Sequence, residues 1–237
     1  MFEILCKNLS INFFNLNNNY LIFKPQNINY ISSPKLKALN NINIEIKENE
    51  RVGLLGKNGS GKTTFLRTLA GVYHLSSGIL KVNSPTTSFL NIGVGLDENA
   101  TGYENIPLLM AAREIPFELY NDVVLDVENF SELADALNRP VRTYSQGMKL
   151  RIAFTVATHI LSNKILLMDE IIAFGDVHFK KKSTERLLDH MNNCKVLVLA
   201  SHSSGLLKTH CERGIVFDKG EVIFDGNIDD AINFNSK

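Results

Sequence analysis

Residues 56–63 read Gly56-Lys57-Asn58-Gly59-Ser60-Gly61-Lys62-Thr63, and this stretch decides how the rest of the chain is interpreted. It fits G-x-x-x-x-G-K-T, the pattern of a phosphate-binding loop. The preceding residues 51–55 predict a short buried strand, and residues 64–70 predict a helix that stops at Gly71. A glycine-rich turn that binds nothing is the competing interpretation. The order strand, loop, helix favours phosphate binding, because this is the context in which the pattern works.

The backbone of the loop explains its chemistry. Gly59 and Gly61 allow the chain to curl so that successive N–H groups point at phosphate oxygens. The helix that follows adds the positive end of its dipole. We expect Lys62 to reach the β- and γ-phosphates and the Thr63 hydroxyl to ligate Mg²⁺. The predicted nucleotide contacts are Gly56, Lys57, Asn58, Gly59, Ser60, Gly61, Lys62, Thr63 and Thr64.

Composition places few other constraints on the chain. Its 237 residues are 44% hydrophobic and 21% charged, which is ordinary for a soluble domain with or without a sub-domain. The formal net charge is zero, so nothing pulls the chain towards nucleic acid. Three widely spaced cysteines favour a reduced, cytosolic compartment. No stretch approaches the roughly 18 apolar residues of a membrane-spanning helix.

Strand patterns surround the loop. Apolar and polar residues alternate in residues 2–13 and 37–46, which predicts two half-buried strands. Residues 77–82 and 88–92 predict two shorter ones. Residues 14–36 are rich in asparagine and carry scattered aromatic residues, so we expect an insertion or a long loop there.

The remaining chain alternates helix and strand patterns. Apolar residues recur at helical spacing in residues 97–140, and a helix is predicted at 145–161. Further elements follow in order: a strand at 164–170, a helix at 179–191, a strand at 195–200, a hairpin at 214–224 and a short C-terminal helix. Buried strands alternating with helices predict an α/β fold with a mostly parallel sheet. Ligands bind beyond the carboxyl ends of such strands, where Lys62, Asp169 and His202 fall.

Polar residues at strand ends supply further candidates: Glu170 and His202 for catalysis, together with Lys62, and Asp169 for the metal. Asp169 ends an apolar strand. In proteins with a phosphate loop, an aspartate in this position holds Mg²⁺. Glu170 follows and is placed to polarise an attacking water. His202 could hydrogen-bond the γ-phosphate. The competing interpretation is that the two acids are merely solvated and that the histidine is structural. The presence of a phosphate loop in the same chain disfavours it.

A second candidate site is the tetrapeptide Ser145-Gln146-Gly147-Met148. Ser145 is a good helix N-cap, which would by itself explain the residue. Alternatively, the Ser145 hydroxyl, the Gly147 N–H and the helix dipole form a second anion site. That site lies far from the phosphate loop in sequence, so it makes sense if two copies of the chain sandwich the nucleotide.

Over nearly its whole length the chain resembles the nucleotide-binding subunit of an ABC transporter. The order of motifs carries the resemblance: phosphate loop 56–63, signature Ser145–Met148, acids Asp169-Glu170 and switch histidine His202. More narrowly, it resembles the ATP-binding subunits of polysaccharide exporters, which move O-antigen, capsule or teichoic acid chains. The segments that carry this likeness are Tyr144–Phe154, Asp169–Asp176, Gly93–Asp97 and Thr101–Asn105.

The resemblance implies a fold, an activity and partners. The fold would be one ABC-type domain over residues 1–237, with a P-loop NTPase core, a mostly parallel sheet, an N-terminal antiparallel β part and a helical sub-domain at about 97–160. The activity would be hydrolysis of ATP with Mg²⁺, coupled to export of a lipid-linked polysaccharide. Partners would be a second copy of the chain and integral-membrane permease subunits, at the cytoplasmic face of the inner membrane. No nucleic-acid partner is implied.

The signature and the lid loop depart from the family pattern. Gln146 stands where most ABC proteins have glycine, and Met148 where they have glutamine, although Met148 is usual in the exporter group. No glutamine occupies residues 90–96, where the family's lid loop usually has one, so Asn91 is the nearest candidate for that role.

Two placements and two rival functions remain open. The aromatic residue that stacks on adenine aligns best with Phe13, with Tyr20 and Tyr30 as alternatives. We expect residues 95–110 to contact the permease, because residues 106–110 are more apolar than a solvated loop requires. The rival functions are an ABC subunit for a lipid or drug, and a non-transport nucleotide switch.

Overall fold

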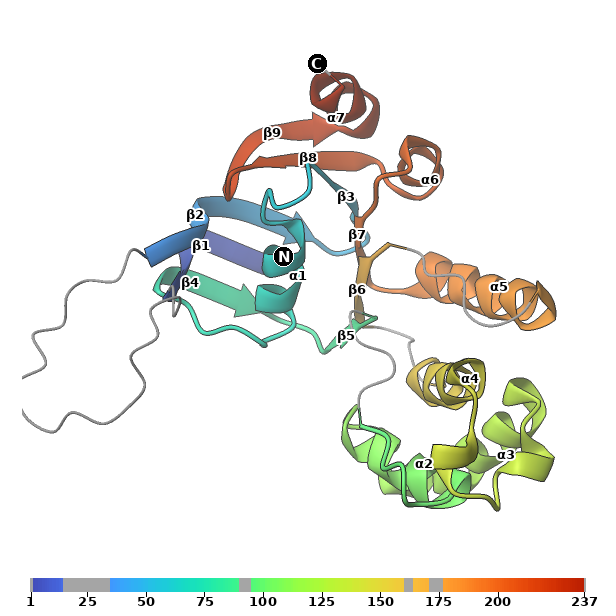
Figure 1. The fold of residues 1–237 in the computed structure, drawn as a ribbon. Coiled ribbons are helices and arrows are strands. Elements are labelled where there is room, and N and C mark those ends of the chain that lie inside the picture. Colours follow the sequence, from blue (N-terminus) through green and yellow to red (C-terminus); the bar gives the residue numbers. More distant parts are fainter. Residues whose placement is uncertain (1, 15–34, 90–94, 160–163, 171–176, 237) are drawn as a thin grey trace, which may run out of the picture. The chain divides into compact units, whose positions relative to one another are not determined.

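The structure is a computed structural model that describes most of the chain, namely residues 2–14, 35–89, 95–159, 164–170 and 177–236. The chain divides into two compact units. One consists of residues 1–84 and 198–237, and the other of residues 85–197. Figure 1 labels the elements of both.

The first unit contains a three-stranded antiparallel sheet in the order β2-β1-β4. Its strands are β1 (Phe2–Phe14), β2 (Lys35–Lys47) and β4 (Ser77–Val82), as the sequence predicted. A register shift between Cys6 and Leu9 contains Asn8, whose φ is 47°. This bulge keeps both side chains on the buried face, although their odd spacing would put them on opposite faces of a regular strand.

The same unit contains the strand that leads into the phosphate loop. β3 (Arg51–Leu55) pairs in parallel with β8 (Arg213–Asp218), which pairs antiparallel with β9 (Glu221–Asn227). Its helices are α1 (Lys62–Leu69), α6 (Ser204–His210) and α7 (Ile228–Asn235). α7 packs closely on β8, since a Cβ at Gly214 would lie 2.4 Å from the Cβ of Ala231. The hairpin and the C-terminal helix were predicted, whereas α6 was missed.

Arg213 on β8 ties neighbouring segments of this unit together. Its guanidinium donates to both carboxylate oxygens of Asp225 at 2.7 Å and to Glu50 Oε2 at 2.6 Å. A further hydrogen bond reaches the carbonyl of Glu45 at 2.8 Å. The hydrogen bonds from Asp225, helped by Glu50, raise the pKa of Arg213 above its ordinary value. Such bidentate pairs fix geometry as well as contributing energy.

The second unit combines short parallel strands with a helical layer. β5 (Thr86–Ser88) pairs in parallel with β6 (Ile165–Asp169), and β7 (Val196–Ala200) crosses the division between the units. The helices are α2 (Gly102–Ala111), α3 (Tyr120–Ser131), α4 (Gln146–Ala157) and α5 (Val177–Asn193), with short 3₁₀ turns at Phe117–Leu119, Ala134–Ala136 and Val141–Thr143. Buried side chains of α2, α3 and α4 form one apolar cluster that includes Ile106, Val127 and Ile152.

Several sequence predictions need correction. Of the strand predicted at 88–92, Ser88 ends β5 (Thr86–Ser88) and Phe89 follows it, whereas residues 90–92 lie outside the described residues. α4 ends at Ala157, a few residues before the predicted end. Ile106, Leu109 and Met110 are buried in the helical cluster, so their apolar character reflects packing of α2 and is no argument for a permease contact. Of residues 106–110, only Leu108 is exposed, at 46%.

Other predictions fall largely outside the described residues. The insertion at 14–36 and the aromatic alternatives Tyr20 and Tyr30 lie there, and so does Asn91. The division into a single domain with a helical sub-domain at 97–160 stays a prediction.

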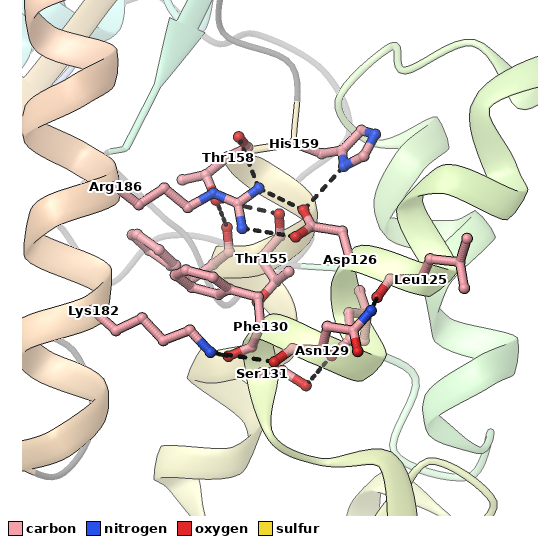
Figure 2. Close-up of polar contacts among 12 residues, drawn as sticks. Leu125, Asp126, Asn129, Phe130, Ser131, Thr155, Thr158, His159, Lys182 and Arg186 are labelled. Atoms are coloured by element: carbon pink, nitrogen blue, oxygen red, sulfur yellow. Dashed lines mark hydrogen bonds and ion pairs between the residues drawn. The ribbon is translucent and has the colours of Figure 1, made fainter.

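An ion-pair network joins α3 and α5 to His159, which lies just beyond the end of α4 (Figure 2). Asp126 on α3 accepts two hydrogen bonds from Arg186 on α5, at 2.9 and 2.5 Å, and lies 3.0 Å from His159 Nδ1. The Arg186 guanidinium also lies 4.3 Å from the centre of the Phe130 ring. Burial raises the pKa of Asp126, but the hydrogen bonds from Arg186 and His159 outweigh burial and hold that pKa below its ordinary value.

Asp126→Asn should lower the free energy of unfolding by about 2 kcal/mol at pH 7, because Arg186 would lose its charged partner while half-buried. The folded-state pKa of Asp126 is depressed, so its stabilisation is present above the unfolded value of about 3.9 and is lost as pH falls through the folded value. Urea unfolding at neutral and acidic pH should show the difference between wild type and variant shrinking in acid. Glu185→Gln, at an exposed position of α5, is the control and should change stability by less than about 0.5 kcal/mol. Equal stability of Asp126→Asn and wild type at pH 7 would contradict this role.

Candidate nucleotide-binding site

The phosphate loop leaves the buried end of β3 in a conformation that only glycine adopts easily. Gly56, Gly59 and Gly61 have φ values of 136°, 78° and 115°. At Gly56 a Cβ would lie 2.3 Å from the Phe217 carbonyl oxygen and 2.6 Å from Ser60 Oγ. At Gly59 a Cβ would meet nothing within 4 Å. Gly56 is therefore required by close packing as well as by its dihedral angle, whereas Gly59 is required by its dihedral angle alone.

The start of α1 has the properties of an anion site. Its N-cap is Gly61, which supplies no side-chain hydrogen bond, and the first turn contains no acidic residue. Ser60 Oγ is buried and has no hydrogen-bond partner among the described residues. A helix that begins in this way offers backbone N–H groups and a positive dipole end to a bound phosphate. The loop thus fits the phosphates of a nucleotide.

Lys62 lies folded over its own loop. Its side chain is 7% exposed, and Nζ donates to the carbonyl oxygens of Gly56 at 2.7 Å and Lys57 at 3.1 Å. These carbonyls keep the ammonium inside the curve of the loop, where sequence reasoning expected it to meet the β- and γ-phosphates. Lys57, Asn58 and Gly59 form the exposed tip of the loop.

The turn between β8 and β9 braces the loop from a distant part of the chain. Gly220 donates its N–H to the Ser60 carbonyl at 2.8 Å and accepts from the Asn40 N–H at 2.8 Å. A Cβ at Gly220, whose φ is 82°, would lie 2.6 Å from the Ala38 carbonyl oxygen. Sequence reasoning saw only a hairpin turn here and missed this role. The close approach of three backbone segments is a tertiary contact that no local pattern announces.

Phe13, the candidate adenine-stacking residue, is half-buried near the end of β1. Its ring packs edge-on against Tyr73, with ring centres 5.0 Å apart and planes at 73°. The Tyr73 hydroxyl in turn accepts from Arg67 Nη1 on α1 at 3.2 Å. These contacts tie the Phe13 ring to the helix that follows the phosphate loop. Its role in stacking on adenine stays a prediction.

His202 lies two residues beyond the end of β7 and is exposed. It lies between two serines that shape the turn into α6. Ser201 Oγ accepts from the Ser203 N–H at 3.1 Å, and Ser203 caps α6 by accepting from the Leu206 N–H at 3.4 Å. The turn therefore holds the histidine backbone while the imidazole stays accessible to a ligand.

In the second unit, the signature tetrapeptide begins α4. Ser145 is the N-cap, and its Oγ accepts from the Met148 N–H at 3.2 Å. Gln146 is exposed, and the nearest atom to a Cβ at Gly147 would be Ser145 Oγ at 3.8 Å. The first turn of α4 contains no acidic residue. The N-cap interpretation is correct, and the open, acid-free turn also leaves room for an anion, so the two interpretations are compatible.

Asp169 ends β6 half-buried, and the exposed Glu170 follows with a φ of 64°. A left-handed conformation is uncommon for a residue other than glycine, and such strain clusters at functional sites. The sequence pattern located both acids but gave no sign of this conformation. Sequence position alone does not show which way the Glu170 backbone turns, because that depends on its surroundings.

The predicted site residues fall into two sets. The phosphate loop, Phe13 and His202 belong to the first unit, whereas the signature and the two acids belong to the second. No cluster of three or more His, Cys, Asp or Glu side chains suited to a metal occurs among the described residues. Mg²⁺ in nucleotide sites usually takes one or two protein oxygens plus phosphate oxygens, so Thr63 and Asp169 stay the predicted ligands. Within the described parts, no helix is long and apolar enough to cross a membrane.

Curated relatives are 32–39% identical to this chain over most of its length. The O-antigen export system ATP-binding protein RfbE of Yersinia enterocolitica is 39% identical over 81% of this chain and 80% of its own length. RfbB of Myxococcus xanthus, of the same description, is 37% identical over 79% of this chain. The teichoic acids export ATP-binding protein TagH of Listeria monocytogenes is 32% identical over 91%. The chain spans only 43% of RfbB and 66% of TagH.

Solved structures show the same fold. An ATP-binding subunit of an ABC transporter superposes with a TM-score of 0.68 at 19% identity, covering 96% of this chain and 90% of that one. A dimeric ATP-binding cassette in a post-hydrolysis state, bound to ADP and Pi, gives 0.64 at 21% identity, with 95% and 98% covered. The family model described as ABC transporter matches residues 39–173, more than half of the sequence. The expected resemblance is thereby confirmed, and this chain belongs to the ABC transporter family.

Proposed function

We propose that the chain is the ATP-hydrolysing subunit of a transporter that exports a lipid-linked polysaccharide. The observation that carries the proposal is the phosphate loop, with an uncapped helix start and a buried lysine held over the curve of the loop. The relatives are named as ATP-binding proteins of O-antigen or teichoic acid export, and these names support a polysaccharide as the exported substrate. The dimeric state of a structural neighbour supports a two-chain arrangement.

The predicted catalytic and metal-binding residues have distinct chemical tasks in this proposal. Lys62 balances negative charge that builds up on the phosphates, and Glu170 accepts a proton from the attacking water. His202 donates a hydrogen bond at the γ-phosphate, and Thr63 and Asp169 supply oxygen ligands for Mg²⁺. When bound, Mg²⁺ neutralises phosphate charge. Ser145 and Gly147 of a second copy close over the same nucleotide.

The proposed location follows from the proposed partners. A subunit that drives a permease works at the cytoplasmic face of the inner membrane, attached through that permease. Purification of the tagged chain from membranes of the cells that naturally produce it should recover a membrane permease. Deletion of the gene for the chain should leave lipid-linked polysaccharide inside the cell. Recovery of a soluble partner would favour a nucleotide switch, and normal polysaccharide export with loss of another substrate would favour a lipid or drug transporter.

Lys62→Ala should reduce ATP turnover by at least about 100-fold, because the ammonium is removed from the developing phosphate charge. Nucleotide binding should weaken as well. Turnover by the purified protein and binding of a fluorescent ATP analogue measure the two effects. Lys208→Ala, which removes an exposed lysine paired with Asp229 on α7, is the control and should leave both unchanged. Wild-type turnover by Lys62→Ala would refute the loop assignment.

His202→Ala should leave ATP affinity within about twofold of wild type and lower kcat by about 100-fold, because the imidazole acts mainly in the transition state. Steady-state turnover and equilibrium nucleotide binding separate the two effects. If affinity falls while turnover per bound ATP is unchanged, the histidine has a structural role and the assignment is wrong.

Glu170→Gln should accumulate as an ATP-bound dimer, because it keeps the side-chain shape but loses the base. Wild type should be mostly monomeric away from its membrane partner. Adding Ser145→Arg should dissolve the dimer, since a bulky cation would fill the signature turn. Size-exclusion chromatography with Mg²⁺-ATP at micromolar protein measures this. An ATP-bound Glu170→Gln monomer would contradict the sandwich, and a dimer indifferent to ATP and to Ser145→Arg would indicate another interface.

A further inference from the structure

Asn105 on α2 has no task in the chemistry proposed above, yet it is completely buried and polar. Its amide oxygen accepts from the Asp97 N–H at 2.7 Å. Its amide nitrogen donates to the carbonyls of Asp97 at 2.9 Å and Thr101 at 2.8 Å, with Ala100 at 3.4 Å. All of these partners are backbone groups of Asp97–Thr101, a segment called here the 97–101 loop. One side chain therefore sets the shape of that loop.

The 97–101 loop in turn lies against the segment that leads into the signature. The Glu98 carbonyl accepts from the Arg142 N–H at 2.8 Å, and the Ala100 carbonyl accepts from the Val141 N–H at 2.9 Å. Thr101 and Pro140 form an isolated antiparallel bridge. The loop thus pairs with the chain just before Ser145 much as one strand pairs with another, and a shift of the loop would shift this segment.

Two further contacts hold the start of α4. The Glu98 carboxylate pairs with Lys149 Nζ at 2.5 Å, one turn into the helix. Tyr144, the residue before Ser145, is buried and donates its hydroxyl hydrogen to the Ala136 carbonyl at 2.8 Å. A Cβ at Gly102, the first residue of α2, would lie 2.4 Å from that hydroxyl oxygen. The first turn of α4 is therefore framed by α2 and the 97–101 loop.

We propose that Asn105 is a positioning residue for the Ser145–Met148 turn and acts through the 97–101 loop. This inference rests on the proposed function, in which that turn closes over the nucleotide of a second copy. A buried amide that lost its partners would cost free energy, so the native arrangement selects one loop shape. The apolar cluster around it supplies packing, whereas Asn105 supplies geometry. Its loss should therefore affect dimer closure and leave nucleotide binding at the phosphate loop of the free chain intact.

The test measures ATP-dependent dimerisation in the Glu170→Gln background. Asn105→Asp keeps the shape of the side chain. It replaces the amide NH₂ group, which donates to backbone carbonyls, with a carboxylate oxygen that cannot donate to them. We expect the dimer dissociation constant to rise at least about tenfold, with ATP affinity of the monomer within about twofold. When the same Asn105→Asp substitution is made in the wild-type chain, which retains Glu170, kcat should fall while KM for ATP stays nearly unchanged. Asn105→Ala is the second variant and should act in the same direction without the added charge.

Two control variants separate positioning from general loss of stability. Val127→Ala removes buried volume from the same apolar cluster without touching the 97–101 loop, and it should lower the Tm yet keep the dimer. Asn129→Asp changes an exposed asparagine on α3, whose amide nitrogen donates within its own helix to the Leu125 carbonyl at 2.8 Å. This variant should change neither the Tm nor dimerisation.

Each outcome decides a different question. If the Glu170→Gln variant without any Asn105 substitution fails to dimerise, the proposed two-chain function is wrong, and the Asn105 inference is wrong as well. If it dimerises and both Asn105 variants dimerise equally well, the positioning role is wrong. Equal loss of the dimer in Val127→Ala, or failure of both Asn105 variants to fold, would show that Asn105 serves the fold alone.

Discussion

The phosphate loop depends on a helix that begins without a side-chain cap. The N–H groups in the first turn of any helix need acceptors, and here the N-cap is a glycine that offers none from its side chain. The same curve of chain places a lysine ammonium against two carbonyl oxygens. A bound polyanion can accept hydrogen bonds from the N–H groups and form an ion pair with the ammonium at the same time. Binding in this loop is thus a property of the backbone conformation, which the glycines permit and the close packing at Gly56 enforces.

The helical part of the second unit is organised differently. Its apolar cluster holds α2, α3 and α4 together, but polar side chains decide how the segments between them run. Asp126 and Arg186 connect α3 to α5 at a place where burial makes an unpaired charge costly. Asn105 organises the 97–101 loop by bonding only to its backbone. Apolar packing is non-directional, so these directional contacts supply the geometry that the signature turn needs.

Strain and exposure meet at the catalytic acid. Glu170 is exposed and adopts a left-handed backbone conformation at the end of a buried strand. An exposed carboxylate can reach solvent water, and the left-handed φ of Glu170 departs from the extended conformation of β6 immediately after Asp169. The two neighbouring acids consequently leave the strand in different environments, one half-buried and one open. Different environments are what two carboxylates need if one is to hold a cation and the other to act on water.

The sequence by itself determined the phosphate loop, the main strands and helices, the N-cap at Ser145 and the family, because each depends on a local pattern of residues at fixed spacing. Tertiary structure alone decided the rest. It buried Ile106, Leu109 and Met110, whose apolar run looked like a docking surface. It brought Gly220 against Ser60 across 160 residues, and it gave Glu170 its backbone conformation. It also turned Asn105 inward. Local patterns report which face of an element is apolar, but what covers that face, and which backbone groups a buried amide meets, depends on residues far apart in the chain.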